Sequence, residues 1–188
     1  WDVQLARWFD ENIPPIERIR TYAQPSRRQA ATPEIARPRY VWPDEETAQR
    51  GTLAIVVAPA ANLTTKLLAE IMGAISGYIL SRNIPRVRLL ISAGELKDFG
   101  MVTTEELTQR MSGPLFAPRT VASIQPALDT IEQSRDVAED SPVLIVTGLP
   151  CDRIKTARTH AFLIPEGGRL PYKSEAPLIE VSESGETE

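Results

Sequence analysis

The sequence predicts an α/β domain of three layers, in which a mostly parallel central sheet has helices on both faces. Short continuous apolar runs such as Leu53-Ala-Ile-Val-Val57 are typical of strands that are covered on both sides. Apolar residues at helical spacing lie between such runs, as in residues 65–82. Strands and helices that alternate along a chain favour a parallel sheet with helices on both faces.

Five apolar runs have the length of buried strands and are too short for helices. They span residues 53–57, 87–91, 143–147, 161–164 and 178–181. In sheets of this kind, binding sites lie where strands end and helices begin. The loops that follow these runs are therefore the candidate site.

Four segments are expected to be helical. Residues 1–11 form a short amphipathic pattern, and residues 65–82 place their apolar side chains on one helix face. Thr103 and Glu106 have the spacing of a capping box, which predicts the start of a short helix. Residues 121–131 complete the set.

Proline content divides the chain into three parts. Residues 1–50 hold six of the sixteen prolines, which break helices and central strands. We expect there an N-terminal helix and then a proline- and arginine-rich arm packed on the domain, because the arm is too apolar for a solvated linker. Its apolar residues are Ile16, Ile19, Tyr22, Ile35, Tyr40 and Trp42. The domain is expected at 51–182, and the acidic tail at 183–188 is expected to be disordered.

The arm carries six arginines between Glu17 and Arg39, against two glutamates. One interpretation is a basic patch for an acidic partner or nucleic acid. The other is an arm whose arginines pair with carboxylates of the domain and whose aliphatic stems pack on apolar surface. The lack of lysines, and of aromatic residues apart from Tyr22 and Tyr40, favours the second interpretation.

The composition argues against several classes of partner. A net charge of −4 does not favour nucleic acid or an anionic membrane. No apolar run approaches the roughly 20 residues that span a bilayer. Cys151 is the only cysteine, so no internal disulfide can form, which fits a cytoplasmic protein. Because the chain begins at Trp1 and not at methionine, we expect a piece of a longer protein.

Common catalytic motifs are absent from the sequence, including the glycine-rich nucleotide-binding loops and the G-x-S-x-G elbow. The only histidine is His160, and one histidine cannot form a typical zinc site. We expect no catalysis and no cofactor. The alternative is a small α/β hydrolase or nucleotide-binding enzyme that uses Cys151, His160 and Asp152, which requires these three residues to meet in one cleft.

The loops after the first and later strands carry a resemblance to a known family. The first loop contains Ala58, Ala60 and Asn62, and Gly148 follows the strand at 143–147. These loops resemble those of von Willebrand factor A domains, in which a D-x-S-x-S motif, a threonine and an aspartate form a metal ion-dependent adhesion site. The resemblance aligns Ala58 with the first aspartate, Ala60 and Asn62 with the serines, Thr120 or Ala122 with the threonine, and Gly148 with the second aspartate.

Flanking segments resemble one bacterial branch of this family, found C-terminal to a metallopeptidase-like region. They are residues 20–28 with Pro38-Arg39, Cys151-Asp152, residues 160–165 and Leu170-Pro171. The resemblance implies a Rossmann-like fold of the von Willebrand factor A type and a partner that is a MoxR-type AAA+ ATPase. Some related systems are linked to bacterial conflict and defence.

The departures from the family motif remove the carboxylates that a Mg²⁺ site usually needs. We therefore expect a degenerate, metal-free site and a non-catalytic module for protein–protein interaction. Its expected interface is the edge of the sheet at which the parallel strands end. The residues assigned to that interface are Asn62, Thr65, Glu95, Asp98, Thr120, Thr147 and Asp152.

Overall fold

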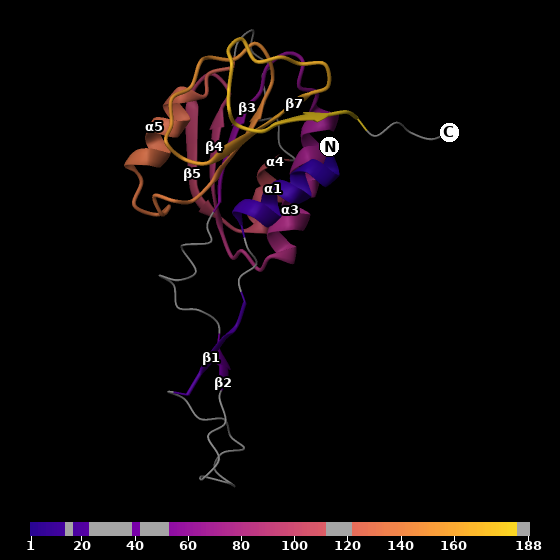
Figure 1. Ribbon diagram of the computed structural model, residues 1–188. Helices are drawn as coiled ribbons and strands as arrows, with labels where there is room; N and C mark the ends of the chain where they lie inside the picture. The colour runs from indigo at the N-terminus through magenta and orange to yellow at the C-terminus, as the bar shows by residue number, and fades with distance from the viewer. Residues whose placement is uncertain (14–16, 23–38, 42–52, 112–121, 184–188) are drawn as a thin grey trace, which may run out of the picture.

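A six-stranded sheet forms the centre of the molecule, with the strand order β5-β4-β3-β6-β7-β8. The computed structural model describes residues 1–13, 17–22, 39–41, 53–111 and 122–183. All neighbouring strands of the sheet are parallel except β4 and β5, which are antiparallel. Figure 1 shows helices on both faces of the sheet. The expected mostly parallel sheet between two helical layers is confirmed.

The strands of this sheet agree with the apolar runs of the sequence to within one residue, apart from β5. They are β3 (Ala54–Ala58), β4 (Val87–Ser92), β5 (Leu96–Val102), β6 (Val143–Thr147), β7 (His160–Pro165) and β8 (Leu178–Val181). No strand was expected at 96–102. Of its residues only Val102 is buried, because β5 lies at the edge of the sheet, and polar residues and Gly100 interrupt its apolar pattern.

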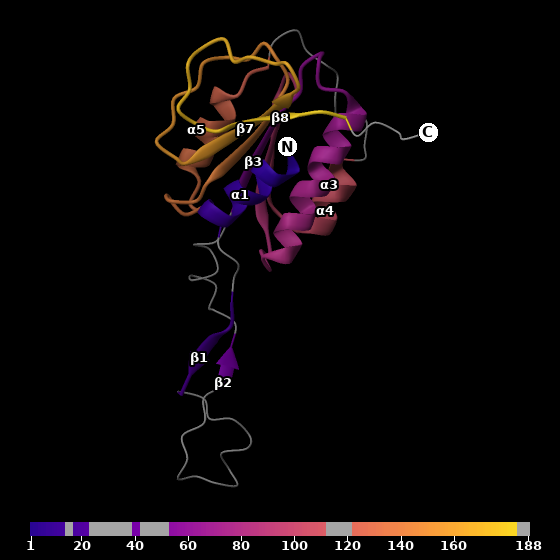
Figure 2. The ribbon, with the colours of Figure 1, turned by 45° about the vertical axis from the view of Figure 1, so that its right-hand side comes forward.

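In the described part of the chain, four helices cover the sheet. They are α1 (Asp2–Asn12), α3 (Thr65–Ser81), α4 (Thr104–Met111) and α5 (Gln125–Gln133). Helices α1, α3 and α4 share one apolar cluster with one face of the sheet, and α5 shares a second cluster with the other face (Figure 2). Among the described helices, none is long and apolar enough to cross a membrane.

Local hydrogen bonds explain where two of these helices begin. Thr64 caps α3, since its side chain accepts a hydrogen bond from the N–H of Leu67 at 3.1 Å. The capping box before α4 is confirmed. The N–H of Thr103 donates to Glu106 Oε2 at 2.9 Å, and the N–H of Glu106 donates to Thr103 Oγ1 at 3.3 Å.

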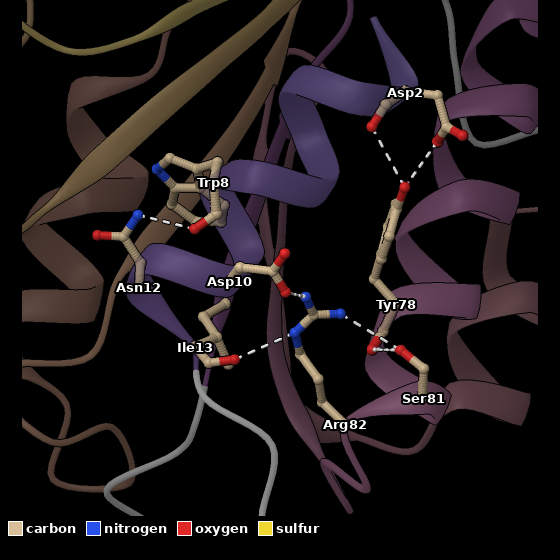
Figure 3. Close-up of polar contacts among 8 residues, drawn as sticks. All are labelled: Asp2, Trp8, Asp10, Asn12, Ile13, Tyr78, Ser81 and Arg82. Atoms are coloured by element: carbon tan, nitrogen blue, oxygen red, sulfur yellow. Dashed lines mark hydrogen bonds and ion pairs between the residues drawn. The ribbon is translucent and has the colours of Figure 1, made fainter.

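Helix α1 is part of the domain, because its side chains enter the core between α3 and the sheet. Leu5 and Phe9 are fully buried. The Arg82 guanidinium lies over the Phe9 ring, with 5.1 Å from Cζ to the ring centroid, and forms an ion pair with Asp10. At the other end of α1, the Tyr78 hydroxyl donates to Asp2 Oδ1 at 2.9 Å (Figure 3).

The described part of the arm is a two-stranded antiparallel ribbon. It consists of β1 (Ile19–Thr21) and β2 (Arg39–Val41). The ribbon lies away from the sheet in both views, and Ile19, Tyr22 and Tyr40 are exposed (Figures 1 and 2). Other parts of the arm lie outside the described residues, so packing of the arm on the domain stays a prediction, one that these exposed side chains do not support.

Candidate functional site

The ends of β3 and β6 lie side by side at the edge where the family resemblance locates its adhesion site. Ala58 is the register partner of Thr147. The N–H of Gly148 donates to the carbonyl of Ala58 at 3.1 Å. The two loops that leave these strands are therefore joined at their first residues.

Thr147 does not lie on the surface of this edge, contrary to the prediction. Its side chain is fully buried, and its hydroxyl lies 2.8 Å from the carbonyl oxygen of Gly148 and 3.2 Å from that of Ala58. The hydroxyl thus satisfies a main-chain acceptor inside the protein and cannot contact a partner. Thr147 ends a strand whose five residues are all buried, which explains its position.

Gly148 has no room for a side chain. A Cβ atom built there would lie 2.6 Å from both Cβ and N of Ala60, and 2.7 Å from Asn62 Oδ1. A side chain at position 148 would therefore force the loop after β3 to move. The loop after β3 therefore occupies the space that any side chain at position 148 would need.

Asn62 joins the same two loops. Its Oδ1 atom accepts a hydrogen bond from the N–H of Leu149 at 2.7 Å. Of the described positions that the resemblance aligns with metal ligands, only Asn62 carries a side-chain oxygen. That oxygen is already used to hold the loop after β6.

Asp152 caps helix α5 from a distant part of the chain. Its carboxylate accepts hydrogen bonds from the N–H groups of Ile124 at 2.6 Å and Gln125 at 3.0 Å. A negative charge is favourable at this end of a helix. Ala122 and Cys151 form a bridge beside it, which brings the segment before α5 against the loop after β6. Asp152 therefore has a structural role at the edge.

Asp98 was assigned to this edge, and the structure places it elsewhere. It lies within β5 opposite Leu90, and its Oδ2 atom is 2.5 Å from an Arg88 guanidinium nitrogen. Arg88 also pairs with Asp136 at 2.7 Å, and only 9% of its side chain is exposed. The prediction failed because β5 was not expected, and Asp98 therefore appeared to belong to a loop.

Two of the remaining residues that were assigned to the interface are exposed. Thr65 lies at the start of α3, and Glu95 lies in the turn between β4 and β5. Thr120 lies outside the described residues. Glu183, which was not predicted, joins this region because its Oε1 atom accepts a hydrogen bond from Thr64 Oγ1 at 2.5 Å. Nothing in the sequence links Glu183 to a residue so distant along the chain.

The chemistry of these loops does not suit a divalent cation. Within the described ranges, no three His, Cys, Asp or Glu side chains lie close enough to hold a metal ion. Ala58 and Ala60 offer no ligand atoms in their side chains, and the carboxylate of Asp152 is bound to two main-chain N–H groups. Mg²⁺ sites normally use at least one carboxylate.

The three residues of the enzymatic alternative do not meet. Cys151 follows the end of β6, whereas His160 is the register partner of Val143 at the start of β6. The five residues of β6 separate them by about 16 Å at the strand rise of about 3.3 Å per residue. His160 Nδ1 lies 2.8 Å from the carbonyl oxygen of Arg158.

Cys151 is a buried thiol and not an activated nucleophile. Only 5% of its surface is exposed. Burial raises the pKa of Cys151 to about 11, and the charge of Asp152 acts in the same direction. Since the thiolate is the reactive form, this site lowers the reactivity of the thiol.

Comparison with known proteins does not assign this site to a family. No protein-family model matches the chain, and neither the curated proteins nor the solved structures give a significant match. The resemblance to von Willebrand factor A domains therefore depends on the residues quoted above.

Proposed function

We propose that this chain is a non-catalytic module for protein–protein interaction, with a fold of the von Willebrand factor A type and no metal site. In this proposal it acts in the bacterial cytoplasm within a multi-protein system, with a MoxR-type AAA+ ATPase as its partner and a role in conflict or defence. The observation that carries the proposal is the closed packing of Gly148 against Ala60 and Asn62.

This packing supports binding through shape and not through a metal ion. Hydrogen bonds of Asn62 and Asp152 hold the loops after β3 and β6. Loops that are fixed before binding lose little conformational freedom when a partner docks. Thr65 and Glu95 remain exposed on the same edge, where they are free to contact a protein surface.

The enzymatic alternative has less support. It depended on Cys151, His160 and Asp152 in one cleft, and the cysteine and the histidine lie at opposite ends of β6. Asp152 is engaged in capping α5. A reaction at this edge would therefore need residues other than these three.

Binding to a purified MoxR-type ATPase tests the proposal. The double variant Thr65→Arg/Glu95→Arg changes two exposed side chains at the proposed interface and should weaken binding at least tenfold. The matched control is Glu139→Arg/Asp140→Arg, which changes two exposed side chains at the opposite edge, before β6, and should bind like the unmodified chain. Equal binding by both double variants would show that this edge is not the interface.

A further inference from the structure

The outer edge of β8 has no neighbouring strand in the described sheet. The N–H of Phe162 donates to the carbonyl of Pro177, and the N–H of Glu166 donates to that of Val181. Alternate residues of a strand direct their main-chain groups to opposite sides. The N–H and C=O groups of Leu178 and Glu180 therefore point away from β7, and such an edge is able to pair with another chain.

A groove runs along this edge, between β8 and α1. Its volume is about 370 Å³. It is lined by Gln4, Arg7, Trp8 and Glu11 of α1 and by residues 177–179. A groove between an edge strand and a helix has the shape that receives an added strand in β-strand addition.

Trp8 forms part of the wall of this groove. The residue is 3% exposed, and its Nε1 atom has no hydrogen-bond acceptor among the described residues. Figure 3 shows its side chain on the side of α1 away from Tyr78 and Arg82.

The charged side chains that line the groove indicate what kind of partner binds at this edge. Arg7 and Glu11 form an ion pair at 2.8 Å, and their side chains remain 80% and 57% exposed. When two copies of α1 meet antiparallel about a two-fold axis that passes midway between Arg7 and Glu11, Arg7 of each copy faces Glu11 of the other. A surface that carries complementary charges on either side of one point matches itself, as an isologous interface requires.

We propose that the chain forms a homodimer in which β8 pairs antiparallel with β8 of a second copy, around an axis at Ile179. Leu178 of each copy then lies opposite Glu180 of the other. The outward main-chain groups of these residues form about four hydrogen bonds across the axis. The two α1 helices flank the joined sheet, and their Arg7 and Glu11 side chains form a network of four charges. This interface is separate from the edge proposed for the ATPase.

Sedimentation velocity with charge variants of the full chain tests this dimer. The unmodified chain should show a concentration-dependent mass of twice the monomer. Arg7→Glu places acidic side chains opposite one another, and Glu11→Arg places basic ones opposite one another, so each variant alone should dissociate at least tenfold more readily. A mixture of the two variants should restore the dimer, because every cross-axis pair is again of opposite charge.

Arg135→Glu is the matched control, since it makes the same change of charge at an exposed residue just after α5. It should sediment like the unmodified chain. The dimer is refuted if the unmodified chain is monomeric at all concentrations, or if the single variants dimerise as well as the control. Single variants that dissociate and are not restored by mixing would also contradict the proposed arrangement.

Discussion

The Oδ1 atom of Asn62 accepts a hydrogen bond of 2.7 Å from the main-chain N–H of Leu149. This contact joins the loop after β3 to the loop after β6. In the von Willebrand factor A family, which the sequence resembles, the corresponding loops face a metal ion. Here the two loops bind each other directly.

Replacing Gly148 with alanine should lower the free energy of unfolding by about 1–3 kcal/mol, the usual cost of overpacking. The added Cβ would lie 2.6 Å from Ala60. Chemical denaturation measures the change. Gly77→Ala is the control, because that position in α3 has nothing within 4 Å, and the substitution should raise the free energy of unfolding by about 0.5–1 kcal/mol. Equal stability of the two variants would contradict the closed packing.

Asp152→Ala should lower the free energy of unfolding by about 1–2 kcal/mol, because it removes the cap of α5. Asp152→Asn keeps one side-chain acceptor and should lower the free energy of unfolding by less. Thermal unfolding followed by circular dichroism compares the two variants. If both are as stable as the unmodified chain, the bonds to Ile124 and Gln125 do not contribute to stability.

Arg82→Ala should release α1 from α3 and lower the free energy of unfolding by about 2–3 kcal/mol, since a largely buried side chain loses packing, ring contacts and hydrogen bonds. The Arg82 Nε–H donates to the carbonyl of Ile13 at 3.1 Å, and the guanidinium lies over Phe9. The rate of amide hydrogen exchange in residues 1–13 should rise. Asp10→Ala removes a partner whose side chain is 73% exposed and should cost less than about 1 kcal/mol. Unchanged exchange in the arginine variant would contradict this role.

The ionisation of Cys151 should make the free energy of unfolding depend on pH only at high pH. Because folding raises its pKa to about 11, the folded state favours the neutral thiol. This contribution is complete below the ordinary thiol pKa and is lost as the pH rises toward 11. Denaturation at pH 8 and pH 10.5 should show a larger loss of stability for the unmodified chain than for Cys151→Ala. Identical pH dependence would mean that the thiol ionises equally easily in both states.

The sequence predicted the central layers because burial determines them. The strands β3, β6 and β7 are covered on both faces, so their residues are almost all apolar and the pattern is clear. At the edge, β5 needs few apolar residues, and no pattern indicated it. Helix α5 begins at Gln125 and not at residue 121, since the segment before it is held by Cys151 and Asp152 from a distant loop.

The candidate site was harder to predict than the fold. The positions of Ala58, Ala60, Asn62 and Gly148 at the ends of strands followed from the apolar runs. The apolar runs did not show whether a polar residue faces solvent or the interior. Thr147 and Asp152 satisfy main-chain groups of other segments, and Asp98 balances the charge of buried Arg88. Such roles depend on tertiary contacts that local sequence does not encode.

Thermal unfolding in the presence of Mg²⁺ and Mn²⁺ tests the closed, metal-free site most directly. An ion that binds the folded state at 100 times its dissociation constant adds about 2.7 kcal/mol of stability, which raises the melting temperature by several degrees. The account predicts no shift in millimolar Mg²⁺ or Mn²⁺ beyond that of a control of equal ionic strength. A saturable shift that Asn62→Ala abolishes would contradict it.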